Sequence, residues 1–229
     1  MAREIIDALG CAAGEARAVL LTGEGRGFSS GANLVDAQRL LDDPMRDVGL
    51  AIEKYLNPMI LAVRSLGLPV VTAVQGAAAG VGASLALAGD LIVCGHSAYF
   101  LQAFRNVGLV GDGGASWLLA RAVGRVRAME MLLLGEKVSA SKALEWGLVN
   151  RVYEDEALRS AALELAGRLA AGPRSLGMMK QVAWSSNDLT LEEAMLLERS
   201  TQLDAGRTDD FAEGLRAFLE KRPPKFNGR

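Results

Sequence analysis

The chain has 229 residues, of which 50% are hydrophobic and 23% are charged, so its composition is that of a folded globular protein and excludes intrinsic disorder. With 25 basic against 27 acidic residues the net charge is −2, which argues against general affinity for nucleic acid. Cys11 and Cys94 are too few for a disulfide framework, and we read no signal peptide at the start. We therefore expect a cytoplasmic protein.

Strand-like and helix-like segments alternate in the first half of the chain. Strands are predicted over 19–22, 70–74 and 91–94, and helices over 44–66 and 82–88. Such alternation is typical of a layered α/β fold.

The segment 66–89 carries no charge and has the small-residue spacing of a membrane-helix contact. However, Pro69, Gln75 and several glycines divide it into a strand, a turn and a helix. We therefore predict no membrane insertion.

After Gly113 the sequence reads almost entirely as helix. Helices are predicted over 113–122, 125–134, 139–146, 155–171, 190–205 and 207–221. Ser139 has a side chain suited to a helix N-terminus, and Thr190 with Glu193 predicts a capping box. No linker or low-complexity tract separates the two halves, so we predict one domain with a helical C-terminal extension.

Two glycine-rich turns, at 25–34 and 76–82, each follow a predicted strand. The second is similar to the nucleotide-binding turn of short-chain dehydrogenases, but none of the three tyrosines is followed by lysine four residues later. A serine hydrolase is disfavoured because the Gly-x-Ser-x-Gly elbow is missing and His96 is the only histidine. Cysteine and histidine are also too few for a metal-ligand cluster.

The two turns could instead each aim a backbone N–H into one pocket. Two such donors form an oxyanion hole, which stabilises the negative charge of an enolate or a tetrahedral intermediate. Turns that only reverse the chain would have the same local composition. The local sequence leaves both interpretations open.

Five motifs follow one another along the chain: AVLLTG with FSSGANL (18–23 and 28–34), VTAVQGAAAGVG (71–82), GDLIV (89–93), GLVGDGGASWLL (108–119) and GEKVSASKALEWGLVN (135–150). In this order they resemble the crotonase superfamily, the enoyl-CoA hydratases and isomerases. The motifs are most similar to those of members that isomerise 1,2-epoxyphenylacetyl-CoA. The resemblance extends to FLEKRPPKF at 218–226.

This resemblance implies an α/β fold, namely a crotonase-like spiral of ββα repeats at 1–170. It also implies a C-terminal helical trimerisation region at 171–229, and therefore a homotrimer or a hexamer. The strands that usually open this fold are missing before the first helix. We interpret this as a start at an internal methionine or as a truncated member.

The family's oxyanion-hole amides fall, by position, on Ala32 and Val81, although the family commonly has glycine at the second position. The substrate contacts implied by the resemblance are Ser30, Gly31, Asn33, Leu34, Gly80, Ser84, Phe104 and Leu109. Lys225, in the basic tail, is the implied contact for coenzyme A phosphates. Coenzyme A is expected as part of a thioester substrate, with no permanently bound cofactor and no metal.

The catalytic positions differ from those of the family's hydratases, which hold a water between two glutamates. Those glutamates align with Ser84 and Phe104, and neither can act as a general base at neutral pH. Asp112 instead matches the aspartate of the ring-enlarging isomerases and of some Δ3,Δ2-enoyl-CoA isomerases. We therefore predict that Asp112 moves a proton while the two amides stabilise the enolate. A turn aspartate without catalytic role is the alternative, because glycines surround it.

Three functions remain open at this point. The favoured one is an enoyl-CoA or ring-type acyl-CoA isomerase of fatty acid metabolism, acting through Asp112. An enoyl-CoA hydratase, which is a lyase, is the second. A homologue that binds acyl-CoA without catalysing a reaction is the third.

Overall fold

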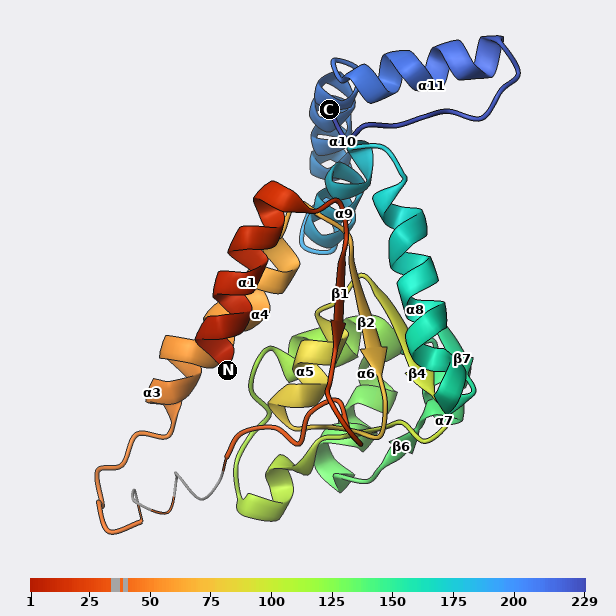
Figure 1. Ribbon diagram of the computed structural model, residues 1–229. Coiled ribbons are helices and arrows are strands. Elements are labelled where there is room, and N and C mark those ends of the chain that lie inside the picture. Colours follow the sequence, from red (N-terminus) through yellow and green to blue (C-terminus); the bar gives the residue numbers. More distant parts are fainter. Residues whose placement is uncertain (34–37, 39–40) are drawn as a thin grey trace.

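The computed structural model describes residues 1–33, 38 and 41–229 (Figure 1). Its larger sheet has four parallel strands in the order β1 (Val19–Thr22), β2 (Val70–Val74), β4 (Leu91–Gly95) and β7 (Arg151–Tyr153). The smaller sheet has the order β3 (Ala77–Ala79), β5 (Tyr99–Leu101) and β6 (Val138–Ser139), with β3 and β5 parallel and β6 antiparallel to β5.

From β2 to β5, consecutive strands alternate between the two sheets, and a helix follows each of the two pairs. Strands β2 and β3 lead into α5 (Val81–Leu87), whereas β4 and β5 lead through the 3-10 helix η3 (Ala103–Val107) into α6 (Ala115–Leu134). These two ββα units are the repeats of the spiral that the motifs predict.

The remaining helices lie around these sheets or beyond them. Near the N-terminal half they are α1 (Ala2–Glu15), α3 (Gly49–Ala51), the π-helix η2 (Ile52–Leu56) and α4 (Asn57–Ser65). The later ones are α7 (Ala140–Glu145), α8 (Asp155–Ala170), α9 (Ser175–Ser186), α10 (Leu191–Ala205) and α11 (Asp209–Leu219). Helices α10 and α11 project away from both sheets (Figure 1).

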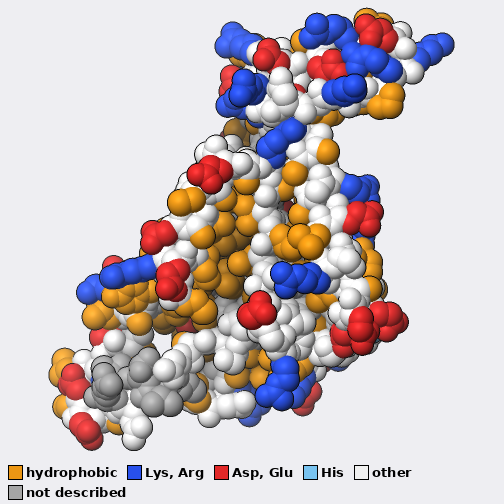
Figure 2. All heavy atoms as spheres, in the orientation of Figure 1, with side chains coloured by type: hydrophobic (Ala, Val, Ile, Leu, Met, Phe, Trp, Pro, Cys, Tyr) orange, Lys and Arg blue, Asp and Glu red, His pale blue; other side chains and the backbone are white. Residues whose placement is uncertain are grey.

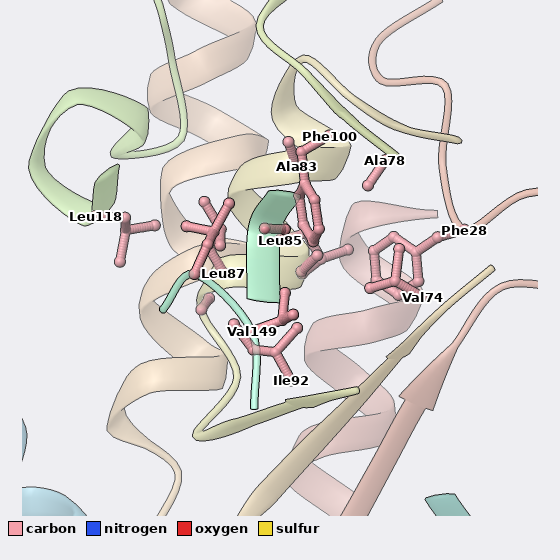
Figure 3. Close-up of a cluster of buried hydrophobic side chains, with 14 of the residues drawn as sticks. Phe28, Val74, Ala78, Ala83, Leu85, Leu87, Ile92, Phe100, Leu118 and Val149 are labelled. Atoms are coloured by element: carbon pink, nitrogen blue, oxygen red, sulfur yellow. The ribbon is translucent and has the colours of Figure 1, made fainter. Parts of the chain in front are cut away.

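Strand β2 is buried on both faces because each face packs against a different cluster. Val71 and Ala73 point toward α8 and pack with Leu158, Ala162 and Leu165. Val70 and Val74 belong to the main hydrophobic core, and Figure 3 shows Val74 beside Phe28 in that core. This period of two is the pattern of a strand in a layered α/β protein.

Several predicted elements are confirmed and several boundaries are wrong. The strands at 19–22, 70–74 and 91–94 are present, and Ser139 and Thr190 cap α7 and α10, the latter with a complete capping box. The helix predicted from 44 begins at Gly49, and the helices predicted over 113–122 and 125–134 are merged into α6 with a kink at Gly124.

Strands β3, β5, β6 and β7 and helix α9 were not predicted. The strands have only two or three residues, which is too short for an alternation of hydrophobic and polar residues to be recognised. The Ala-Ala-Ala of β3 also has low strand propensity. In α9, Gly177 interrupts the helical pattern, and its missing side chain lets the helix lie directly against the backbone of Gly67.

Candidate active site

Two segments far apart in the sequence run side by side at the centre of the site. Ser29 forms an isolated parallel bridge with Ala78, in which the Ser29 N–H donates to Ala77 O at 2.9 Å and the Ala79 N–H donates to Ser29 O at 2.9 Å. Ala32 and Val81 each follow this bridged pair by three residues. The pairing therefore carries both predicted oxyanion-hole amides to the same end of the two segments.

Glycines at 31 and 82 permit this close approach. Gly31 has a φ of +93°, and a Cβ there would lie 2.8 Å from the carbonyl oxygen of Ala79. A Cβ at Gly82 would lie 2.6 Å from both Cβ and Oγ of Ser29. Gly31 in the first glycine-rich turn and Gly82 in the second are therefore required because the two segments meet there.

Both amides are available as donors. Val81 is the first residue of α5, so its N–H has no acceptor within that helix. In the described part of the chain, the Ala32 N–H donates to no acceptor. A side-chain carbon of Val81 lies 3.0 Å from where a Cβ of Gly113 would be, so the valine packs toward the Gly113 turn. A side chain at position 81 thus leaves the amide in place.

A cavity of about 670 Å³ lies in front of these amides. Six residues of the predicted site line it: Gly31, Ala32, Asn33, Val81, Leu109 and Asp112. Most of the other lining side chains are apolar, among them Ile52, Leu56, Met59 and Leu85. Figure 2 shows hydrophobic side chains gathered in the hollow between α1 and the larger sheet. Such a lining suits an apolar ligand held by a few polar groups.

Asp112 supplies a carboxylate to the lining of this cavity. Its Oδ1 is buried and has no hydrogen-bond partner among the described residues, and burial raises the pKa of the carboxyl above its ordinary value of 3.8. Its backbone carbonyl accepts from the Ala115 N–H at 3.0 Å, at the start of α6. An unpaired, partly buried carboxylate beside free amide donors is typical of an acid–base group rather than of a turn cap.

The two positions that the resemblance aligns with the glutamates of hydratases both lie near the Asp112 turn. Ser84 is fully buried, and its hydroxyl donates to the backbone carbonyl of Asp112 at 2.9 Å. The Phe104 ring lies against Gly80 and Gly111, with Cζ 3.7 Å from the position of a Gly80 Cβ. Neither position supplies an acid or a base.

Several residues predicted to contact substrate lie outside the described lining of the cavity, namely Ser30, Gly80, Ser84 and Phe104. Ser30 is exposed, whereas its neighbour Ser29 lines the cavity. Leu34 lies outside the described residues. The roles assigned to these five residues stay predictions.

Lys225 lies in a tail that packs back on α11. Its backbone N–H donates to Glu213 Oε1 at 2.9 Å, and its side chain is exposed. The buried Asp210 carboxylate accepts from the N–H groups of Asn227 and Gly228 at 2.7 and 3.0 Å. The tail is thus ordered, but Lys225 is not among the described residues that line the cavity, and its contact with coenzyme A stays a prediction.

The cavity also has lining residues that sequence reasoning missed. Asp47 is a second carboxylate, exposed, and its Oδ1 accepts from the Gly49 N–H at 2.8 Å where α3 begins. Tyr55 and the first two residues of the chain line the same cavity. An aspartate just before a helix was a visible signal for a cap, but nothing local showed that this helix faces the Asp112 turn.

Comparison with known proteins identifies the family. The profile of the enoyl-CoA hydratase/isomerase family matches residues 1–229. A protein of Escherichia coli, 1,2-epoxyphenylacetyl-CoA isomerase, is 45% identical over 93% of this chain and 82% of its own length. This chain belongs to the enoyl-CoA hydratase/isomerase family.

Other members of the enoyl-CoA hydratase/isomerase family are similar over comparable lengths. Trans-2-decenoyl-[acyl-carrier-protein] isomerase of Streptococcus mutans is 38% identical over 92% of this chain and 81% of its own. The crystal structure of an enoyl-CoA hydratase from Polaromonas sp. JS666 superimposes with a TM-score of 0.93 at 36% identity, covering 99% of this chain and 89% of that one. The expected crotonase fold and the expected acyl-CoA-processing enzyme are confirmed at the level of the family.

Two further observations concern this family member in its described residues. None of their helices combines the length and the apolar character that crossing a bilayer demands. Within the same residues, no group of three or more His, Cys, Asp or Glu side chains is placed to hold a metal ion.

Proposed function

We propose that this enzyme is an enoyl-CoA isomerase in which Asp112 carries the proton. The observation that supports the proposal is Asp112, a partly buried residue with an unpaired Oδ1, in the lining of the cavity that Ala32 and Val81 also line. The name of the Escherichia coli relative, 1,2-epoxyphenylacetyl-CoA isomerase, agrees with isomerisation and extends the candidate substrates to ring-type acyl groups.

The chemistry follows from one base and two amides. With a 3-enoyl thioester bound, the carbonyl oxygen of the thioester accepts hydrogen bonds from the N–H groups of Ala32 and Val81. Asp112 removes a proton from the carbon next to the carbonyl, and the resulting dienolate oxygen is stabilised by both amides. The protonated Asp112 then returns the proton to the fourth carbon, which moves the double bond into conjugation with the carbonyl.

Replacement of Asp112 by asparagine tests this function. Asp112→Asn keeps the side-chain size and removes the base, so conversion of a 3-enoyl-CoA into the 2-enoyl-CoA should fall by about 100- to 10,000-fold. Binding of a saturated acyl-CoA, measured by calorimetry, should stay near that of the parent. Asp47→Asn is the matched control, because Asp47 is a carboxylate of the same cavity whose Oδ1 already accepts a backbone N–H. Unchanged isomerisation by Asp112→Asn contradicts the proposal.

Hydration is the second candidate, because relatives and structural neighbours include enoyl-CoA hydratases. The fully buried Ser84 and the Phe104 ring leave the two glutamate positions of the hydratases without a carboxylate. We therefore expect poor hydration of crotonyl-CoA by the parent protein. Efficient hydration by the parent would favour a hydratase, and binding of acyl-CoA without turnover of any thioester would favour a non-catalytic homologue.

We further propose that the protein is a homotrimer, or a hexamer of two trimers. Large hydrophobic side chains on α10 and α11 are exposed in the single chain: Leu191, Met195, Leu196, Leu203, Phe211, Leu215, Phe218 and Leu219. A face of this kind marks a protein interaction site. Light scattering at micromolar concentration should give the mass of at least three chains, and a stable monomer would exclude the trimer.

We also propose a cytoplasmic enzyme of fatty acid metabolism that takes coenzyme A only as part of its thioester substrate. Both cysteines are free thiols, with Cys94 buried, which suits a reducing compartment. Fractionation of the source cells, followed by an antibody against the chain, would locate it.

A further inference from the structure

We propose that Ser84 is a positioning residue that holds the Asp112 carboxylate at a set distance from the oxyanion-hole amides. This inference rests on the proposed function. Its central observation is the hydrogen bond from Ser84 Oγ to the backbone carbonyl of Asp112, 2.9 Å long and formed by a side chain with no exposed surface.

The bond joins two elements that carry different parts of the site. Ser84 lies on α5, one turn after Val81, whose N–H is a proposed oxyanion donor. Asp112 lies in the turn before α6. The hydroxyl therefore ties the helix that holds the oxyanion donor to the turn that holds the base.

The Asp112 turn lies directly on the same face of α5. A Cβ at Gly113 would be 3.0 Å from Cγ2 of Val81 and 3.1 Å from Cβ of Ser84, so this turn has little room to move toward the helix. The carbonyl of Asp112 accepts from both Ser84 Oγ and the Ala115 N–H. Held on two sides through its backbone, Asp112 keeps its side chain available for the cavity.

A serine within a helix has a nearer acceptor available. Its hydroxyl commonly bonds the carbonyl four residues earlier, which here belongs to Gly80. In this chain the hydroxyl donates across to the Asp112 turn instead. The proposed proton transfer does not use the Ser84 hydroxyl. The role of Ser84 is therefore to be found in its hydrogen bond to the backbone carbonyl of Asp112.

Positioning predicts a particular kinetic change. Without the bond, the turn can shift relative to α5 while the cavity that binds the thioester is unchanged. A misplacement of about 1 Å can cost on the order of 100-fold in rate. For Ser84→Ala we expect kcat to fall by roughly 10- to 100-fold, with the affinity for a saturated acyl-CoA near that of the parent.

Thr72 offers a matched control. Its hydroxyl is also fully buried and donates at 2.9 Å to a carbonyl of the same helix, that of Ala86, and not to the Asp112 turn. Thr72→Val and Ser84→Ala each delete one buried hydroxyl-to-carbonyl bond at α5. Both variants should lose stability, and only Ser84→Ala should lose kcat per folded molecule.

The experiment measures kcat, KM and acyl-CoA affinity for the parent, Ser84→Ala, Ser84→Cys, Thr72→Val and Asp112→Asn with one 3-enoyl-CoA. Ser84→Cys keeps a donor, although a weaker one, and fills the buried space should the alanine variant fold poorly. It should lie between the parent and Ser84→Ala in kcat.

Two results overturn the inference. One is an unchanged kcat in both folded Ser84 variants, and the other is an equal loss of kcat in Thr72→Val. Failure of the proposed function looks different, because Asp112→Asn would then isomerise as fast as the parent.

Discussion

Gly82→Ala adds one methyl group at the contact between α5 and the segment that holds Ala32. The new Cβ would lie 2.6 Å from Cβ and Oγ of Ser29 and 2.8 Å from the Ser29 carbonyl oxygen, whereas ordinary contact begins at 3.4 Å. One of the clashing atoms is backbone, so a side-chain rotation cannot relieve the overlap. The N-terminus of α5 has to move away from Ser29.

That displacement sets the expected magnitudes. Inserting a methyl group into a packed interior costs about 1–3 kcal/mol of unfolding free energy. Moving α5 by somewhat under 1 Å also separates the Val81 N–H from the Ala32 N–H. Loss of one oxyanion donor costs on the order of 100- to 1,000-fold in kcat, and partial misalignment should approach the lower end of that range. Asp112 and the apolar lining keep their chemical groups.

Isomerisation of a 3-enoyl-CoA and urea unfolding are the two measurements. Gly167→Ala is the control, because Gly167 lies in the exposed face of α8 with no atom within 4 Å of a built Cβ. The unfolding free energy of that variant should rise by up to about 1 kcal/mol, and its activity should stay that of the parent. Full activity of Gly82→Ala would refute the conclusion that the contact with Ser29 aligns the two amides.

Three further predictions concern charged groups. Because burial raises the pKa of Asp112, the isomerisation rate should rise with pH through that raised pKa. The unfolding free energy of the parent relative to Asp112→Asn should fall as pH increases from 3.8 through the raised pKa. A rate that rises already near 3.8, together with a free-energy difference that does not change with pH, would contradict the burial of this carboxyl. The buried Lys180 lies 3.0 Å from Asp90, so Asp90→Ala should lower the unfolding free energy by about 3–5 kcal/mol. Lys180→Met should lower the unfolding free energy by less than Asp90→Ala does, since Asp90 keeps two N–H donors, one of them Trp184 Nε1. Urea unfolding of both variants measures the difference. Lys225→Ala should weaken coenzyme A binding at low salt and not at high salt, and equal affinity at low salt would remove Lys225 from the site.

Local patterns were sufficient for the longer and better-marked elements. The β-branched run of 70–74 predicts a strand wherever it lies, because its side chains suit a pleated, buried surface. Thr190 with Glu193 predicts a helix start because both partners of the capping box lie within four residues. The order of the glycine-rich motifs was sufficient for the family, and the resemblance predicts Ala32, Val81 and Asp112 as site residues.

Tertiary contacts decided the geometry of the site, because its parts lie far apart in the chain. Ser29 and Ala78 are separated by 48 residues, and only their pairing puts the two amide donors at one place. Glycine neighbours predicted a turn around Asp112 equally well for a solvated cap and for a base. Tertiary packing buries Oδ1 of Asp112 without a partner, and this burial raises the pKa of the carboxyl. Desolvation depends on which atoms surround a group, and no local run of residues specifies those atoms.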